Sequence, residues 1–273
     1  MKLPLRSAQQ SHVKLLQITD THLFSAQDGT LLSINTGDSF QAVVDTIVEQ
    51  GEMFDALVSS GDISQDHSEA SYRKFSQGIE PLELPCFWLP GNHDYQPNMQ
   101  SALEDGQILA ETHVLLGDKW QMILLDSQVA KVPHGKLSAV QLTLLDEKLA
   151  QHPERHTLVW LHHNSLPVGS AWLDQHILKN RDEFWQVIQR HSNVKTVVCG
   201  HVHQEVDVMH QGVRVLATPS TCVQFKPDSQ EFALDAKAPG WREIELLPDG
   251  SIETQVKRLP AGQFQPDFSA AGY

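Results

Sequence analysis

Cysteine is scarce in this 273-residue sequence, which contains only Cys86, Cys199 and Cys222. They form no CxxC pair and no zinc-finger spacing, so they predict reduced thiols rather than disulfides or a structural metal site. No apolar run approaches the roughly 18 residues that a membrane helix needs. The first residues also lack the apolar segment of a secretory signal. We therefore expect a cytoplasmic protein that does not span a membrane.

Positive charge is also in short supply, because 20 Lys and Arg stand against 34 Asp and Glu and give a net charge of −14. Non-specific DNA or RNA binding depends on a basic surface, so this balance argues against a nucleic-acid partner. The excess of negative charge would also repel an anionic phosphate ester, unless bound metal ions reverse the charge of the site. Fifteen histidines, a high number for this length, are candidate ligands for such ions.

The sequence does contain a series of strand-like apolar runs that end in polar residues. The runs cover 13–19, 56–60, 86–90, 157–161 and 194–199. The residues that follow them are Asp20-Thr21-His22, Gly61-Asp62, Gly91-Asn92-His93, His162-His163 and Gly200-His201-Val202-His203. Helix-like segments lie between the runs, at 39–50, 71–77, 99–103, 138–150 and 182–191, with Ser39 and Ser138 as expected N-caps. This alternation predicts an α/β fold, in which ligands bind at the carboxyl ends of the strands.

We expect a single domain over residues 1–273, because no repeat, linker or low-complexity segment interrupts the chain. The polar clusters lie within 20–203. Beyond them, two hairpins are predicted, around His210-Gln211-Gly212 and around Pro248-Asp249-Gly250-Ser251. The polar tail from Pro260 predicts an irregular surface segment. Residues 204–273 therefore form a C-terminal extension of hairpins and tail.

The polar strand ends carry side chains that are typical ligands of divalent metal ions. Imidazole and carboxylate together suit Zn, Fe, Mn or Ni. Seven such side chains are too many for one tetrahedral ion and suit two ions that share a carboxylate. Asp20 and His22 would point the same way if the strand continued past Thr21. His201 and His203 could do the same, or bind different ions if the backbone turns between them.

The three glycines within these clusters, Gly61, Gly91 and Gly200, predict sharp turns or a close approach of neighbouring backbone. Each polar cluster alone would be an ordinary loop. Five in a fixed order, each after a strand-like run, indicate one assembled metal site.

The order DxH, GD, GNHD, H and GHxH resembles the signature of the calcineurin-like metallophosphoesterases. Longer strings are similar to those of the bacterial class III 3′,5′-cyclic AMP phosphodiesterases, namely LQITDTHLF at 16–24, WLPGNHD at 88–94, LLDSQV at 124–129, CGHVHQE at 199–205 and LATPSTCVQFKP at 216–227. The resemblance implies an α/β (α+β sandwich) fold of two packed mixed β-sheets flanked by helices. One departure is Asn164, which stands where these phosphodiesterases often have a further Pro. It puts in doubt only a contact that supports a ligand or touches the substrate, and it leaves the ligand His162 in place.

The resemblance also implies two divalent ions, with Fe or Mn first and Zn or Co as alternatives. Metal site 1 would take Asp20, His22, Asp62 and His203, and metal site 2 would take Asp62, Asn92, His162 and His201. Asp62 would bridge the ions and be catalytic, and a hydroxide between the ions would be the nucleophile. His93 would be the second catalytic residue, which hydrogen-bonds the phosphate or protonates the leaving oxygen. The residues implied to contact the substrate are His22, Asp62, Asn92, His93 and His203.

The activity implied is hydrolysis of 3′,5′-cyclic AMP, a small-molecule cyclic nucleotide, to 5′-AMP, which would lower cellular cyclic AMP. Another phosphodiester or a phosphomonoester stays open as the substrate. A noncatalytic scaffold of the same fold predicts lost ligands, whereas all seven are present. The sequence does not define the oligomeric state.

Four further positions carry expectations of their own. Asp94 would either orient His93 or cap the following loop. His163 should point away from the centre if its strand continues, and His67 is a candidate for approaching the substrate. Residues 218–225 are the candidate segment for binding base and ribose, with a plain strand interrupted by Pro219 as the alternative.

Overall fold

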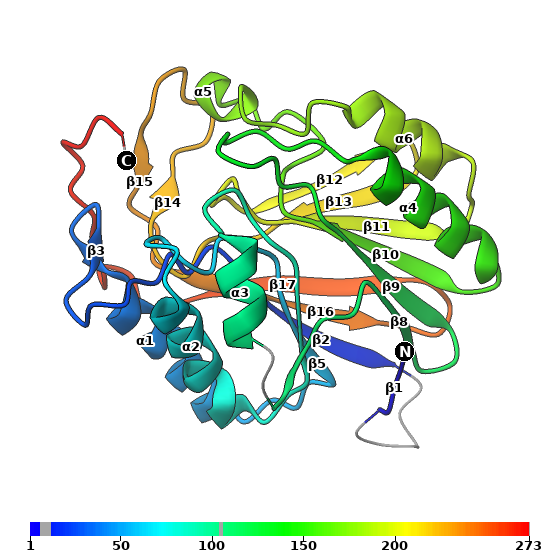
Figure 1. Cartoon of the computed structure of the whole chain (residues 1–273), viewed down its shortest axis with the longest axis horizontal. Coiled ribbons are helices and arrows are strands. Elements are labelled where there is room, and N and C mark those ends of the chain that lie inside the picture. Colours follow the sequence, from blue (N-terminus) through cyan, green and yellow to red (C-terminus); the bar gives the residue numbers. More distant parts are fainter. Residues whose placement is uncertain (6–11, 104–105, 273) are drawn as a thin grey trace.

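Two β-sheets pack face to face in the computed structural model of the chain, and helices cover both outer faces (Figure 1). The structure describes residues 1–5, 12–103 and 106–272. One sheet has six strands in the order β17-β16-β2-β5-β6-β7, and the other has seven in the order β1-β8-β9-β10-β11-β13-β12. Each sheet contains both parallel and antiparallel pairs. The predicted sandwich of two mixed sheets flanked by helices is confirmed.

The six-stranded sheet contains the first three predicted strands as a parallel centre. The second predicted hairpin continues this sheet, antiparallel to β2. The strands are β2 (Val13–Ile18), β5 (Ala56–Ser59), β6 (Cys86–Trp88), β7 (Ile108–Leu109), β16 (Gly240–Leu246) and β17 (Ile252–Arg258).

The seven-stranded sheet contains the other two predicted strands and the first predicted hairpin, β12 and β13. The strands are β1 (Lys2–Leu3), β8 (His113–Leu116), β9 (Trp120–Leu125), β10 (His156–Leu161), β11 (Val194–Cys199), β12 (Val206–His210) and β13 (Val213–Ala217). Strand β9 was not predicted, although all six of its residues are buried.

The predicted helices are present, with shifted boundaries. They are α1 (Thr36–Gln50), α2 (Glu69–Ile79), α3 (Gln96–Leu103), α4 (Ala139–Gln151) and α6 (Arg181–Gln189). Ser138 caps α4 as predicted. The prediction of Ser39 as the cap of α1 is wrong, because the side chain of Asn35 accepts the amide of Asp38 and starts the helix three residues earlier. A buried Ser39 inside the helix instead donates to the carbonyl of Thr221.

Several shorter elements lie in the connections. They are β3 (Thr30–Leu31), β4 (Ile34–Asn35), the 3₁₀ helix Glu80–Leu82, α5 (Ala171–Asp174), β14 (Gln224–Phe225) and β15 (Leu234–Asp235). The tail after Pro260 has no helix or strand in its described part, up to residue 272, as expected. Among the described residues, no helix combines the length and apolarity needed to cross a membrane.

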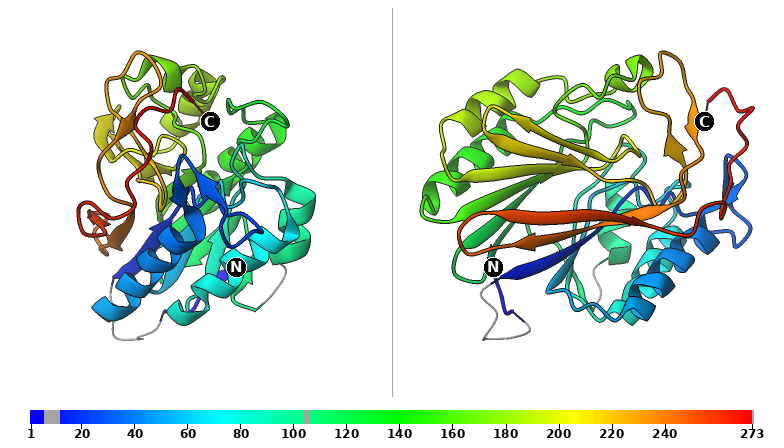
Figure 2. Two further views of the ribbon diagram at one scale, coloured as in Figure 1. Left: turned by 90° about the vertical axis from the view of Figure 1, so that its left-hand side faces the viewer. Right: turned by 180° about the vertical axis from the view of Figure 1, so that it is seen from behind.

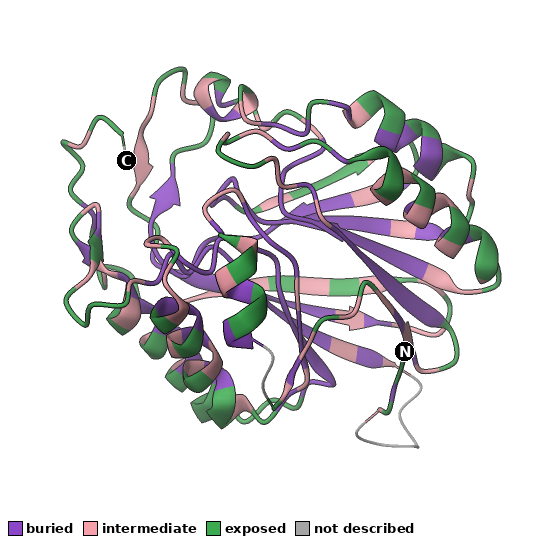
Figure 3. Cartoon of the chain, in the orientation of Figure 1, coloured by how far each residue is buried: buried purple, intermediate pink, exposed green. Residues whose placement is uncertain are grey.

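Buried residues, purple along the ribbon in Figure 3, form three apolar layers through the two sheets, and a further apolar cluster lies around Cys199, Cys222 and Phe225. The middle layer lies between the sheets and includes Trp120, Trp160 and Phe87. The outer layers pack α1, α2 and α3 on the six-stranded sheet, and α4 and α6 on the seven-stranded sheet. Burying each such large apolar side chain contributes about 1.5–3 kcal/mol, so the packing of the two sheets holds the strand ends in fixed positions.

Polar side chains join the sheets just below the carboxyl ends of the strands. Nε2 of Gln17 on β2 donates to Oγ of Ser60 (2.8 Å) and to the carbonyl of Cys199 on β11 (3.1 Å). The Thr218 hydroxyl donates to Gln17 and accepts from the guanidinium of Arg242, a fully buried side chain. Unpaired buried polar groups are costly, so this network fixes the register between the sheets.

A second link joins the sheets at the edge that is seen from behind in Figure 2. Arg214 on β13 donates from Nη1 to the carbonyl of Ile252 on β17 (2.8 Å). Its Nε and Nη2 form a bidentate pair with Asp207 on β12.

Candidate metal centre

Five of the seven predicted ligands have a left-handed backbone conformation. Their φ angles are 54° at Asp20, 46° at His22, 52° at Asp62, 67° at His201 and 48° at His203. A residue with a side chain adopts this region at a cost of about 1–3 kcal/mol, and such strain concentrates at functional sites. The strand does not continue past Thr21, so the extended arrangement considered for Asp20 and His22 is wrong. The backbone also turns between His201 and His203.

Two glycines allow the loops of the centre to approach one another closely, as predicted. Gly61 has a φ of 101°, and a Cβ there would lie 2.6 Å from Nδ1 of His162. A Cβ on Gly91 would overlap the carboxylate of Asp62. Any larger residue at either position would displace a predicted ligand.

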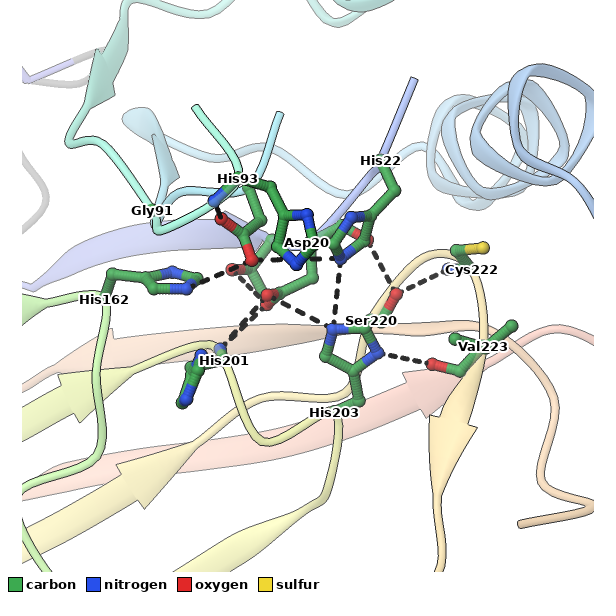
Figure 4. A network of polar contacts seen from close by, with 12 residues as sticks. Asp20, His22, Gly91, His93, His162, His201, His203, Ser220, Cys222 and Val223 are labelled. Carbon is green, nitrogen blue, oxygen red and sulfur yellow. Dashed lines mark hydrogen bonds and ion pairs between the residues drawn. The ribbon is translucent and has the colours of Figure 1, made fainter. Parts of the chain in front are cut away.

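The first group of predicted ligands comprises Asp20, His22 and His203 (Figure 4). Nε2 of His203 lies 3.3 Å from Oδ1 of Asp20 and 3.2 Å from Nε2 of His22. Two atoms bound to one ion at about 2.1 Å each lie about 3 Å apart when they are at right angles. The spacing therefore fits one shared ion.

The second group comprises Asp62, Asn92 and His162. Nε2 of His162 lies 3.3 Å from Oδ2 of Asp62 and 3.2 Å from Oδ1 of Asn92. The same Oδ2 of Asp62 lies 3.9 Å from Nε2 of His22 in the first group. Asp62 thus stands between the two groups, at the position predicted for a bridging carboxylate.

His201 borders the second group. Its ring centroid is 5.1 Å from that of His162, and ligand atoms of the two side chains lie within 4.8 Å. Nε2 of His201 is buried and has no hydrogen-bond partner among the described residues. A buried nitrogen without a partner is costly, and a metal ion would satisfy it.

The outer nitrogens of three histidines are held by hydrogen bonds that free Nε2 for a ligand. Nδ1 pairs with Oε1 of Gln65 in His22 (2.7 Å), with the Ser60 carbonyl in His162 (2.8 Å) and with the Val223 carbonyl in His203 (2.9 Å). Each acceptor assigns the proton to Nδ1 and leaves the Nε2 lone pair facing the centre. This pattern is typical of metal-binding histidines.

The protein's own charges leave the centre short of positive charge. Burial would raise the pKa of the Asp62 carboxyl, but His162 and His93 outweigh it and hold the pKa well below its usual value. Burial would lower the pKa of His162, yet Asp62 raises it to about 9. Burial lowers the pKa of His22 to about 3, so this ring is neutral. An imidazolium at His162 would offset only one of the two buried carboxylates of Asp20 and Asp62, whereas divalent cations, bound at the Nε2 atoms that face the centre, would balance both.

The prediction that His163 points away from the centre is wrong. Strand β10 ends at Leu161, and the buried His163 ring lies 5.0 Å from that of His162 and 4.7 Å from that of His201. Its Nδ1 pairs with Oγ of Ser127 (2.8 Å). The ring therefore packs directly behind two predicted ligands.

His93 and Asp94 follow Asn92 and have separate roles. The backbone amide of His93 donates to Oδ1 of Asp62 (2.8 Å), and its ring meets that of His22 edge-on at 5.0 Å. Burial lowers the pKa of His93. The Asp94 carboxylate accepts the amides of Gly91 (2.9 Å), Ile63 (3.1 Å) and Ser64 (3.1 Å). These amides belong to the preceding Gly91 and to the Asp62 loop, so Asp94 joins the Asp62 loop to the Asn92 loop, which neither of the two predicted roles described.

Residues 218–225 support the predicted ligands from behind. Oγ of Ser220 donates to the Asp20 carbonyl (2.7 Å), and Val223 holds His203 as described above. The Phe225 ring stacks on His203 with centroids 4.3 Å apart. The whole segment is buried. The interpretation of this segment as the base-binding site is therefore not supported, since it orients ligands instead.

A cavity of about 500 Å³ opens beside the centre and is lined by residues of several loops. Asn92, His93 and His201 line it, together with His67, the candidate for approaching the substrate. The other lining residues are Lys131, Val132, Pro133, Trp172, Leu173, His176, Phe232 and Gly272. Sequence reasoning did not find these eight, because none lies in a motif and no spacing connects their segments.

The fold and the centre define a class of protein. Two packed mixed sheets carry at their strand ends two adjoining sets of nitrogen and oxygen ligands, and this is the arrangement of a two-metal phosphoesterase. The chain belongs to the calcineurin-like phosphoesterase family, whose sequence model matches residues 13–205.

Similar proteins agree with this assignment. A protein of Vibrio vulnificus, 3′,5′-cyclic adenosine monophosphate phosphodiesterase CpdA, is 58% identical over 97% of this chain and 96% of its own length. The protein of the same name from Escherichia coli K12 is 52% identical over 100% of this chain and 98% of its own. Among solved structures, a dimetal phosphatase from Danio rerio superposes with a TM-score of 0.61 at 14% identity, covering 90% of this chain and 98% of that one. At that identity the structural match shows the fold alone.

Proposed function

We propose that this chain hydrolyses 3′,5′-cyclic AMP to 5′-AMP and so lowers cellular cyclic AMP. The observation that carries the proposal is that six of the seven predicted ligands form two adjoining groups linked by Asp62, with His201 beside the second group. The near full-length identity to proteins named as cyclic AMP phosphodiesterases supports the substrate. The reaction breaks the bond between phosphorus and the 3′ oxygen. Water supplies OH to phosphorus and a proton to the leaving 3′ oxygen.

The donor set fits two divalent ions, with Asp20, His22, Asp62 and His203 as ligands of one and Asp62, Asn92, His162 and His201 as ligands of the other. Bound there, the ions supply positive charge for the phosphate and lower the pKa of a water molecule. The mixture of imidazole, carboxylate and amide without thiolate permits Fe, Mn, Zn or Co, and the family resemblance places Fe or Mn first. Elemental analysis of protein purified without added metal, together with reconstitution by each ion in turn, tests the identity.

The chain's own residues then orient the substrate and move protons. The side chain of His93 lines the cavity beside Asn92 and reaches the space where a phosphate would lie. We assign to it the hydrogen bond to phosphate or the proton delivered to the 3′ oxygen. The Asp62 carboxylate accepts the backbone amide of His93. This one hydrogen bond fixes the position of the proposed bridging ligand relative to the proposed proton donor. His22, Asp62, Asn92 and His203 complete the predicted set of residues around the phosphate.

The experiment that tests the function is a hydrolysis screen with metal-reconstituted protein. The compounds are 3′,5′-cyclic AMP, 2′,3′-cyclic AMP, bis-p-nitrophenyl phosphate and p-nitrophenyl phosphate. We expect the highest kcat/KM for 3′,5′-cyclic AMP with 5′-AMP as product. Activity on the artificial esters alone would keep the metal chemistry and reject the substrate. Absence of turnover on all four compounds would favour a noncatalytic scaffold. The complete set of predicted ligands argues against that outcome.

The reaction's cellular setting is also a proposal. The three cysteines are free and buried, which suits the reducing cytoplasm. A strain that lacks the gene should contain more cyclic AMP, and an unchanged level would contradict the physiological part of the proposal. The single domain over residues 1–273 stays a prediction.

A further inference from the structure

The cavity beside the metal centre differs in charge from the rest of the chain. The chain has a net charge of −14, yet no Asp or Glu is among the described residues that line the cavity. Among these lining residues, Lys131 is the one charge of fixed sign. An anionic ligand is therefore tolerated here and disfavoured over most of the remaining surface.

The part of the cavity away from the predicted ligands has an aromatic corner. The rings of Trp172 and Phe232, both half-buried, meet at 67° with centroids 5.1 Å apart. Two faces at this angle can hold a flat ring that stacks on one of them and touches the edge of the other.

A series of ring contacts connects this corner to the metal centre. Trp172 meets Phe225 edge-on at 4.9 Å, and Phe225 stacks on His203 at 4.3 Å. Packed aromatic rings keep few rotamers, so the corner has a fixed position relative to the predicted ligands. A substrate whose phosphate lies at Asn92 and His93 would thus meet a preformed aromatic surface with its uncharged end.

We infer that Trp172 and Phe232 form the nucleobase subsite, in which the base of the substrate stacks while its cyclic phosphate lies at the metal centre. The inference rests on the proposed function and extends it to the residues that select the base. A cavity of about 500 Å³ is within the range of small-molecule sites. Stacking recognises the face of a ring, so purines should be preferred over the smaller pyrimidines, and the distinction between adenine and guanine should be weaker.

The test compares two substrates in four proteins. The substrates are 3′,5′-cyclic AMP and methyl riboside 3′,5′-cyclic phosphate, which has the same ring phosphate and no base. The proteins are the wild type, Phe232→Leu, Trp172→Phe and the control Phe268→Ala, whose exposed side chain lies on the tail and outside the cavity. Metal content is measured for each, so that a variant with a damaged centre is recognised.

We expect Phe232→Leu to lower kcat/KM for cyclic AMP about 5- to 150-fold, the range of one base–aromatic stack, and to leave the base-free substrate within about twofold. Trp172→Phe retains an aromatic face and should lose less than Phe232→Leu. Phe268→Ala should match the wild type. Equal losses on both substrates in metal-replete Phe232→Leu would overturn the inference.

Binding of products gives a readout that needs no turnover. By calorimetry, Phe232→Leu should weaken binding of 5′-AMP by the same factor and leave ribose 5-phosphate unchanged. If wild-type protein hydrolyses neither cyclic phosphate, the proposed function fails, while preferential binding of 5′-AMP that depends on Phe232 would still support the base subsite. Equal affinities of the wild type for 5′-AMP and ribose 5-phosphate would reject the subsite whatever the activity.

Discussion

The two sheets contribute different chemistry to the centre. All three predicted oxygen ligands, Asp20, Asp62 and Asn92, follow strands of the six-stranded sheet, whereas three of the four predicted histidine ligands follow strands of the seven-stranded sheet. Each of the two predicted metal sites therefore takes ligands from both sheets. Metal binding should therefore be coupled to the packing of one sheet on the other, since ions that bind only the assembled form stabilise it.

The sheets also hold their ligand loops by different means. On the six-stranded side, the Asp94 carboxylate ties together the backbone of the two oxygen-bearing loops. On the seven-stranded side, a separate buried segment, 218–225, holds the His203 side chain. Backbone capping suits short, rigid carboxylate and amide ligands, while a longer imidazole needs a partner on its far nitrogen.

Removal of metal should have the largest effect, because it deletes what both sheets share. Two sites, each with free ion at 100 times its Kd, contribute about 5 kcal/mol together. Dialysis against EDTA should abolish turnover and lower Tm by about 10 °C or more, and excess Mn²⁺ should restore both. Calorimetric scans of the two forms check this. Equal Tm values would show that the sheets pack without help from metal.

Removal of the bridging carboxylate should have the second-largest effect. Asp62→Ala removes the carboxylate between the two groups, and we expect kcat/KM to fall at least about 10³-fold, with fewer than two ions bound per chain. Steady-state kinetics and elemental analysis measure both. Asp118→Asn, at an exposed carboxylate far from the centre, is the matched control. Wild-type turnover in Asp62→Ala would reject the two-ion mechanism.

A variant of His93 distinguishes a role in metal binding from a role in proton transfer. It lies next to Asn92 on the six-stranded side but is not a predicted ligand. His93→Ala should keep two ions and lower kcat about 10²-fold or more. Metal lost from this variant would reassign His93 as a ligand.

The polar link between the sheets should have a moderate effect. Gln17→Leu leaves Ser60, Cys199 and Thr218 without their buried partner, at a cost of about 1–3 kcal/mol of unfolding free energy. Because the link lies directly below the ligand loops, metal affinity should also fall about 10-fold. Urea titration and metal competition measure the two quantities. A stability loss with unchanged metal affinity would mean that the sheets pack independently of the centre.

The smallest effect is expected at the far edge, where Asp207 orients Arg214. Arg214 lowers the pKa of Asp207 below its usual value, so the pair stabilises the fold above the unfolded pKa of about 3.9, and this is lost as pH falls through the folded pKa. The side chains are partly exposed, so Asp207→Asn should cost only about 0.5 kcal/mol at pH 7 and 0.1 M salt. The difference from wild type should shrink as the pH falls through the lowered folded pKa of Asp207 and vanish below it. A constant difference across pH would exclude a charge effect.

The sequence predicted which side chains come together at the strand ends better than it predicted their surroundings, for a physical reason. Ligands such as Asp62 and His203 are chemically restricted residue types at strand ends, and so they form a readable motif. Nothing in the sequence pattern indicates the left-handed φ angles of these residues, so the turn of the backbone after Thr21 was not predicted. His163 was misjudged for the same reason, because its expected direction assumed a strand that in fact ends at Leu161.

The cavity could not be predicted, since packing rather than pattern brings its walls together. Trp172 lies in a helix of four residues and Phe232 in a loop, and both are ordinary apolar residues in the sequence. The hairpins were predictable because turn chemistry is local. Contacts between segments that are 40 to 140 residues apart require the fold itself.

The central claim is that two ions are held between the sheets with Asp62 on both. Anomalous scattering from a crystal of the Mn²⁺-reconstituted protein tests it most directly. We expect two peaks, one near Asp20, His22 and His203 and one near Asn92, His162 and His201, each within bonding distance of Asp62. A single peak, or two peaks that contact residues of only one sheet, would contradict the account.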